Sequence, residues 1–329
     1  MTTEMTERHP LVIINPKSAS GKTGRRWPSV APLLLSRLPN AECVFTTRAG
    51  EGTDLARRAL QEGPRLIVAA GGDGTVNEVV NGFFDERGTP LQTQARLGVL
   101  PLGTGSDLCR SLGIPRDPAL AVELLTEPSR AVDCGWAETD EMSHAFLNIA
   151  SLGISSEVAR HFEEHGKSGV ISYVSGLFSA ARRYEERRLT LRFDVAARSA
   201  AEPEWVERTL TSAFVCALAN GQFFGGGMHI APDAQLNDGL LQCVMVRGLN
   251  TLEILRYLPS LFRGKHLKHE PFSALEARGV ELIVNRDTYL ELDGEPVLCV
   301  KPERPARVKL IPHALKVHTA QHGAALQVS

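Results

Sequence analysis

A run of glycines around one aspartate follows directly on a short apolar segment near position 70. Residues 66–70 are all apolar, and the sequence continues Gly-Gly-Asp-Gly-Thr-Val-Asn-Glu. This order predicts a buried strand, a tight turn and the start of a helix. Glycines let backbone N–H groups converge on an anion, and a helix start adds unpaired amides and the positive end of its dipole. The segment therefore predicts a phosphate site.

Asp73 stands inside this turn, where a carboxylate would repel phosphates unless a divalent cation lay between them. It therefore indicates a metal–nucleotide complex rather than a bare anion. A purely structural turn is the alternative, because Thr75 and Glu78 have the spacing of a capping box, with Thr at the N-cap. We expect this cap to form, but it does not account for the glycines. Asn77 and Asn81 would share one helix face, as ligands or as solvated side chains.

The first third of the chain alternates apolar segments with stretches of helical character. The expected strands are residues 11–14, 42–45, 66–70 and 97–100, and the expected helices are 27–38, 53–61, 118–125 and one that begins at 76. This alternation is typical of a parallel sheet covered by helices.

From about residue 132 the apolar segments become strand-like and closely spaced. The expected strands are residues 146–149, 189–195, 209–217, 240–246, 272–277, 280–284 and 289–292. Turn residues between them favour an antiparallel β domain. Helices are expected at 169–184 and 251–262, and an exposed loop at 196–207.

Composition narrows the class of protein. The 329 residues are 43% hydrophobic and 22% charged, as in a globular protein of about two domains. A net charge of −2 gives no field that would recruit nucleic acid. Six cysteines without a CxxC pair are typical of buried thiols in a reducing compartment. The polar N-terminal segment lacks an apolar signal core, and no stretch approaches the ~20 apolar residues of a membrane span, so we expect a cytoplasmic protein.

Two further turns follow other expected strands. Residues 97–100 run into Pro-Leu-Gly-Thr-Gly-Ser-Asp, which ends at Asp107. On neighbouring parallel strands, Asp73 and Asp107 would meet at the carboxyl edge of the sheet and surround one nucleotide and its metal. The third turn, residues 15–23, ends in Gly-Lys-Thr, but Pro16 stands where a Walker A motif needs glycine, so we set aside a P-loop ATPase. It forms either a polar loop at the same edge or a solvated loop.

Asp293 and Glu295 flank a glycine at the end of the expected strand 288–292. Phosphoryl transfer to an alcohol needs a base near the attacking hydroxyl, and the glycine lets both carboxylates turn toward one cleft. A hairpin turn explains the same residues, because Asp-Gly is common turn chemistry. The sequence leaves both interpretations open.

Three other segments allow a structural and a functional interpretation. His161 and His165 are four residues apart but lack the metalloprotease order and a third ligand, which favours an exposed helix face. The basic stretch 263–269 either contacts anionic lipid or is a solvated helix end, and we favour the second. The apolar face of the expected helix 169–184 packs on the core or forms the wall of an apolar substrate site.

Taken together, the motifs resemble the diacylglycerol kinase catalytic family, which includes bacterial diacylglycerol kinases, YegS-like lipid kinases and sphingosine kinases. The segments that carry the resemblance are 15–16 with its Ser-Gly loop, 71–82, 102–107, 148–153, 220–221 with 225–227, 232–240 and 292–296. The Gly-Gly-Asp-Gly-Thr element also occurs in NAD kinases and phosphofructokinases, but its continuation resembles the lipid-kinase branch. The chain departs from the pattern at Ser106, where most members carry Asn, and at Leu108, where Phe is common.

The resemblance implies an α/β plus all-β fold. An N-terminal phosphofructokinase-like, parallel-sheet nucleotide-binding domain would comprise residues 1–132 together with a returning segment of about 308–329. Residues 133–307 would form a C-terminal antiparallel β-sandwich that holds the lipid or other substrate.

It also implies an ATP- and Mg²⁺-dependent lipid kinase that transfers the γ-phosphoryl group to a lipid hydroxyl. The residues implied to bind the nucleotide are Asn15, Thr46, Gly71, Gly72, Asp73, Gly74, Thr75, Asn77, Glu78, Gly103, Thr104, Gly105 and Asp107. Asp73 and Asp107 would organise catalytic Mg²⁺. Asp238, with the backbone carbonyls of Gln235 and Leu240, would hold a second, structural Mg²⁺. Glu295 would accept the proton, with Asp293 as its partner or rival.

Other functions remain open on sequence alone. The rival enzyme is a NAD kinase or another soluble-substrate kinase, and the non-enzymatic alternative is a nucleotide or lipid sensor. We expect a lipid partner at the membrane surface, peripheral contact with the inner membrane face and no nucleic-acid partner. No motif records which lipid is used, and a homodimer is one of the open oligomeric states.

Overall fold

The computed structural model describes residues 8–63, 65–91, 94–104, 107–154, 158, 176, 187–195 and 204–320. The chain divides into two compact units, Met1–Val132 with His313–Ser329, and Asp133–Pro312. The histidines at 161 and 165, the predicted helix at 169–184 except residue 176, and most of the predicted loop 196–207 lie outside the described residues.

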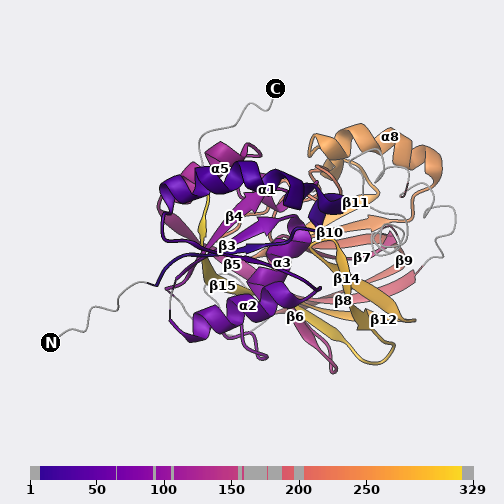
Figure 1. Cartoon of the computed structure of the whole chain (residues 1–329). Coiled ribbons are helices and arrows are strands. Elements are labelled where there is room, and N and C mark those ends of the chain that lie inside the picture. Colours follow the sequence, from indigo (N-terminus) through magenta and orange to yellow (C-terminus); the bar gives the residue numbers. More distant parts are fainter. Residues whose placement is uncertain are drawn as a thin grey trace. The chain divides into compact units, whose positions relative to one another are not determined.

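The first unit is a parallel sheet covered by helices on both faces. Its elements are β1 (Leu11–Ile14), α1 (Ser18–Arg37), β2 (Glu42–Phe45), α2 (Glu51–Gln61), β3 (Leu66–Gly71), α3 (Asp73–Asn81), β4 (Arg96–Pro101), α4 (Asp107–Ser111) and α5 (Pro118–Leu124). The strand order is β2-β1-β3-β4, and the end of β15 (Ala306–His318) pairs in parallel with β4. Helices α1 and α5 lie on one face, and α2 and α3 on the other (Figure 1). The predicted parallel α/β architecture is confirmed.

The central strands of this sheet are buried along their whole length. Every residue of β1 and β3 is buried, whereas the edge strand β2 is largely exposed. Strands covered on both faces need continuous apolar sequence, and this pattern predicted the two strands from the sequence. The carboxyl ends of β1, β3 and β4 lead into the three polar turns.

The second unit is built from antiparallel strands. These are β5 (Ser129–Glu138), β6 (Ser143–Phe146), β7 (Ile149–Gly153), β8 (Arg187–Asp194), β9 (Trp205–Ala219), β10 (Leu241–Arg247), β11 (Phe272–Ala277), β12 (Gly279–Val284), β13 (Thr288–Leu292), β14 (Glu295–Val300) and most of β15. The path β14-β13-β7-β9-β8-β12-β15 is antiparallel throughout, and β10 joins β9 to β11. The predicted antiparallel β domain is confirmed.

Among the described residues of this unit, one long helix packs on the β domain. Helix α8 (Thr251–Phe262) lies between β10 and β11 in the chain and is followed by a short 3-10 helix, η1 (His266–Lys268). Asn250 caps α8, because its Oδ1 accepts hydrogen bonds from the amides of Leu252 and Glu253. In turn, the Asn250 amide donates to the Glu253 carboxylate. This capping box fixes where the helix begins, close to the predicted residue 251.

Candidate active site

The three glycine-rich or polar turns of the first unit lie together at the carboxyl edge of its sheet. The amides of Leu102 and Gly103 both donate to the Gly71 carbonyl, at 2.9 Å each. Thr23 Oγ1 donates to the Leu102 carbonyl at 3.1 Å, and the Asn15 amide donates to the Ala70 carbonyl at 3.1 Å. The predicted meeting of these turns at one edge is therefore confirmed.

Glycine is required where the first two turns touch. A Cβ atom on Gly103 would lie 2.4 Å from Gly72 Cα, and one on Gly71 would lie 2.4 Å from Thr75 Oγ1. Both distances are far shorter than any real carbon contact. Gly103 thus lets the backbones of the two turns approach closely, and Gly71 leaves space for the Thr75 side chain at the start of α3.

Helix α3 begins earlier than the capping-box interpretation predicts. Its N-cap is Gly72, which has no side-chain cap, and Asp73 is the first helical residue. The expectation that Thr75 would be the N-cap is therefore wrong. Thr75 lies inside the first turn instead, 3% exposed, and its Oγ1 has no hydrogen-bond partner in the part of the chain that the structure describes. A buried hydroxyl without a partner is costly unless a ligand completes it.

Glu78 serves another helix. Its carboxylate accepts hydrogen bonds from the amides of Gly50 at 2.9 Å and Gly52 at 3.0 Å, and its carbonyl accepts one from Thr53 Oγ1 at 2.7 Å. It therefore caps the start of α2, where the helix dipole favours a negative charge. The predicted bond from Glu78 back to its own helix start is replaced by these contacts.

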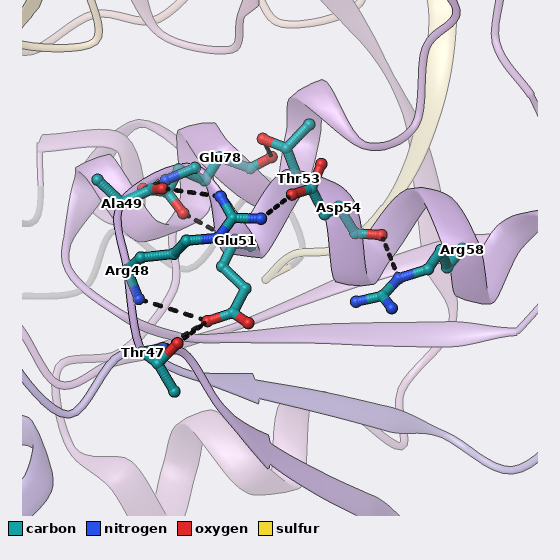
Figure 2. A network of polar contacts seen from close by, with 10 residues as sticks. Thr47, Arg48, Ala49, Glu51, Thr53, Asp54, Arg58 and Glu78 are labelled. Carbon is teal, nitrogen blue, oxygen red and sulfur yellow. Dashed lines mark hydrogen bonds and ion pairs between the residues drawn. The ribbon is translucent and has the colours of Figure 1, made fainter.

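A polar network orders the loop that carries Thr46 (Figure 2). Thr46 is buried, and its amide donates to the Ile14 carbonyl at 2.8 Å. Beyond it, the amides of Thr47 and Arg48 and the Thr47 hydroxyl donate to Glu51, and Arg48 pairs with Asp54 (Figure 2). The hydrogen bonds from Thr47 lower the pKa of Glu51. The loop is thus held beside the end of β1.

The two predicted metal-binding acids stand at the starts of two helices. Asp73 is the first residue of α3, and Asp107, largely buried, is the first residue of α4 and accepts a bond from Arg110 at 3.1 Å. Burial raises the pKa of the Cys109 thiol, and the charges of Asp73 and Asp107 raise it further. Carboxylate oxygens in this setting suit Mg²⁺.

The remaining nucleotide candidates differ in their surroundings. Asn77 is 4% exposed and accepts from the Asn81 amide group on both its carbonyl and Oδ1, so the interpretation of this pair as solvated side chains is wrong. Thr104 is exposed at the turn. Gly74 lies in the first turn of α3, whereas Gly105 and Ser106 lie outside the described residues.

Asp293 organises a bend in the second unit. Its carboxylate accepts from the amides of Leu147 at 2.9 Å, Asn148 at 2.9 Å and Ile149 at 3.1 Å, and its backbone has φ +51. These bonds hold the break between β6 and β7, which the sequence predicted as a single strand over 146–149. Asp293 therefore has a structural task that extends well beyond its own hairpin.

Glu295 begins β14, opposite Leu292 of β13, and is partly exposed. It lies beyond Gly294, so the two acids of the motif have different surroundings. Sequence reasoning missed a nearby buried acid, Glu291, which is 7% exposed and accepts from Ser151 Oγ at 3.4 Å. An acid in an otherwise apolar strand was the available signal.

The predicted second metal set lies in a loop held by another acid that the sequence analysis missed. Asp133 is fully buried, its Oδ2 accepts from the Gly239 amide at 2.7 Å, and its amide donates to the Leu236 carbonyl at 2.6 Å. Asp238 Oδ1 accepts from the Leu240 amide at 3.0 Å, while Gln235 is exposed. Within the described residues no three His, Cys, Asp or Glu side chains form a metal-binding group. The predicted set, with one carboxylate and two backbone carbonyls, is of a different kind.

An apolar pocket lies beneath α8 in the second unit. Its walls come from β9, β10, β11, the turn around Phe224 and the inner face of α8, and its volume is about 50 Å³. The lining residues are Ile154, Phe214, Val215, Phe224, Met228, Ile230, Val246, Leu249, Ile254, Tyr257, Leu258, Leu261 and Phe272. Every one is apolar or aromatic, so the pocket suits hydrocarbon.

The basic stretch after α8 is only partly solvated. Arg263, Lys265 and Lys268 are exposed, but His266 is fully buried, with Nε2 3.0 Å from the Ile230 carbonyl. Burial lowers the pKa of His266 to about 4. The expectation of a solvated helix end therefore fails at His266, because this imidazole packs into the domain.

A parallel sheet with glycine turns at its carboxyl edge, followed in the chain by an antiparallel β-sandwich, is the fold of diacylglycerol kinases and related kinases. Residues 9–137 match the diacylglycerol kinase catalytic domain. Residues 148–319 match the YegS C-terminal NAD kinase beta sandwich-like domain. The chain belongs to the diacylglycerol kinase catalytic family, as the resemblance of its motifs predicted.

Individual relatives agree with this assignment. The chain is 32% identical over 286 residues to a probable YegS-like lipid kinase of Chromohalobacter salexigens, covering 85% of this chain and 84% of the relative. It is 31% identical over 254 residues to the diacylglycerol kinase of Bacillus subtilis, covering 76% and 77%. A crystal structure of a putative diacylglycerol kinase from Bacillus anthracis shares the fold, with a TM-score of 0.73 at 22% identity over 97% of this chain and 98% of that one. Among the described helices, none has the length and apolar character needed to cross a membrane.

Proposed function

We propose that the protein is an ATP- and Mg²⁺-dependent lipid kinase that phosphorylates a lipid hydroxyl. Its family supports phosphoryl transfer. The observation that carries the choice of a lipid acceptor is the apolar pocket beneath α8, in whose lining the phenol of Tyr257 is the one polar side-chain group.

The donor site would be formed by the turns of the first unit. The start of α3 at Gly72 provides first-turn amides with no acceptor inside the helix, and the buried Thr75 hydroxyl lacks a partner among the described residues. Both features fit bound phosphate oxygens, which would accept those hydrogen bonds. Asp73 and Asp107 would hold Mg²⁺, which when bound neutralises charge on the transferring phosphoryl group.

We assign the role of proton acceptor to Glu295 rather than to Asp293. The oxygens of Asp293 already accept three backbone hydrogen bonds, which stabilise its charge and occupy most of its lone pairs. Glu295 follows the turn that Asp293 anchors. Asp293 would therefore position the segment that presents Glu295.

The experiment is a phosphorylation assay with radiolabelled ATP and Mg²⁺. The acceptors are diacylglycerol, phosphatidylglycerol and a sphingoid base in mixed micelles, with NAD as the soluble acceptor. We expect label in a lipid product, and a loss of at least about 100-fold in rate for Asp73→Asn, because removing a charge that stabilises the transition state costs that much. Asp117→Asn, at the exposed N-cap of α5, is the matched control and should keep wild-type activity. Transfer of the label to NAD and not to any lipid would overturn the proposal. Full activity of Asp73→Asn would overturn it as well.

A further inference from the structure

Helix α8 has two apolar faces with different surroundings. Ile254, Tyr257, Leu258 and Leu261 follow helical spacing and line the internal pocket. Leu252 and Leu255 point the other way and are 77% and 53% exposed. Figure 1 shows α8 at the outside of the second unit. Two leucines exposed to this degree on one helix face need an explanation beyond the packing of the core.

One exposed cation lies on the helix face of these leucines, and three more follow the end of α8 in the chain. Arg256 lies on the same face as Leu252 and Leu255, and Arg263, Lys265 and Lys268 follow in the next turns, all of them exposed. The same region has two acids. Glu270 pairs with Arg247, whereas Glu253 accepts from the neutral Asn250 amide and keeps its negative charge. The four exposed cations outnumber this carboxylate, so the local charge is positive.

We propose that this face is a docking surface for an anionic lipid bilayer. The α8 docking surface consists of Leu252, Leu255, Arg256, Arg263, Lys265 and Lys268. Exposed leucines with cations beside them and at the helix end are typical of segments that lie in the membrane interface, where the apolar side chains enter the acyl boundary and the cations meet anionic headgroups. A protein partner would have to match this same pairing of leucines and cations, whereas a bilayer matches it without any specific shape.

Docking here would have a consequence for the pocket. The inner face of α8 lines the apolar pocket. A bilayer on the outer face of α8 would therefore lie one helix diameter from that pocket. This consequence rests on the proposed function, since it concerns delivery of a lipid acceptor. The docking itself does not, because binding to vesicles needs no catalysis.

The test is cosedimentation of the full chain with vesicles, without nucleotide. Vesicles of phosphatidylcholine alone are compared with vesicles that also contain phosphatidylglycerol. We expect binding only to the anionic vesicles, and weaker binding as salt rises. Lys265→Gln with Lys268→Gln should weaken binding by about fivefold for each cation removed. Leu252→Ser with Leu255→Ser should weaken it by at least about tenfold, because two leucines no longer enter the bilayer.

Two matched controls separate the α8 docking surface from general surface effects. Leu120→Ser removes a leucine of the first unit that is 51% exposed, and Arg208→Gln removes an exposed cation from β9. Both should bind anionic vesicles as the wild type does, and thermal unfolding should verify that all variants are folded. The docking proposal would be overturned if the wild-type protein did not bind anionic vesicles. It would also be overturned if the α8 variants bound as tightly as the controls. Neither result would bear on lipid phosphorylation in detergent micelles, so the two proposals fail separately.

Discussion

At the scale of single residues, the two acids of the Asp-Gly-Glu motif have separable tasks. Asp293 accepts three backbone hydrogen bonds, whereas Glu295 begins the next strand and is partly exposed. The sequence alone allowed both a hairpin turn and a catalytic pair at these two acids. The contacts of Asp293 lie more than a hundred positions away in the chain, so no local pattern could reveal them.

These tasks predict opposite outcomes for two conservative substitutions. Glu295→Gln should lower kcat by about 10²–10⁴-fold, because it removes the proposed base, and leave the free energy of unfolding within about 0.5 kcal/mol of wild type. Asp293→Asn places an amide donor against backbone donors and should cost about 1–3 kcal/mol or more in stability. Urea unfolding and steady-state kinetics on both variants measure these effects. A stable, inactive Asp293→Asn beside an active Glu295→Gln would reverse the assignment.

Glu78 shows how a correct spacing leads to a wrong local prediction. Thr75 and Glu78 have the capping-box spacing, yet the helix begins at Asp73 and the carboxylate of Glu78 holds the amides of Gly50 and Gly52. Amides at the start of α2 compete for the same carboxylate, and their approach depends on packing that no sequence window contains.

At the scale of elements, the donor site depends on the contact between the turn before α3 and the turn after β4. Gly103→Ala would place a Cβ atom 2.4 Å from Gly72 Cα, so the turns must separate. We expect a loss of ATP affinity of at least about tenfold, because the turn amides leave their positions, with a loss of about 1–3 kcal/mol in stability. Equilibrium binding of ATP with Mg²⁺ and urea unfolding measure the two effects.

The control for this substitution is Gly279→Ala in β12. A Cβ atom there would meet its nearest neighbour at 3.4 Å, an ordinary contact, and the residue lies in the second unit. Its ATP affinity should match that of the wild type. If Gly103→Ala also bound ATP normally, the close approach of the two turns would have no role in holding the nucleotide.

Several strands appear at or within one residue of their expected bounds. The buried β1, the exposed edge strand β2 and the partly exposed β11 have the expected bounds, whereas β3 and β4 extend one residue further. The continuous apolar sequence of parallel strands covered on both faces is therefore one of several patterns that predicted a strand. β5 and β14 were not predicted. β5 includes the buried Asp133 and a glycine, and β14 begins with Glu295 and a proline. Neither segment therefore has the residue pattern that predicts a strand.

At the scale of the whole molecule, the sequence was sufficient for the class of each unit and for the family. Ordered motifs along the chain carry that information, and the turns of the first unit meet as their positions after parallel strands required. The sequence did not reveal the proposed binding site of the lipid acceptor. The apolar pocket is assembled from strands, a turn and α8, which lie far apart in sequence, and its residues are of types that any core contains.

The central claim, that the acceptor is a lipid held in this pocket, is tested most directly by filling the pocket. Leu258→Trp adds bulk to an α8 residue that lines it, and Leu120→Trp adds the same bulk to an exposed position of the first unit. The measurement is the pair of KM values, for the lipid acceptor in mixed micelles and for ATP. We predict that Leu258→Trp raises the lipid KM by about tenfold or more with the ATP KM unchanged, because space for hydrocarbon is lost while the donor turns are untouched. An unchanged lipid KM in folded Leu258→Trp would contradict the claim.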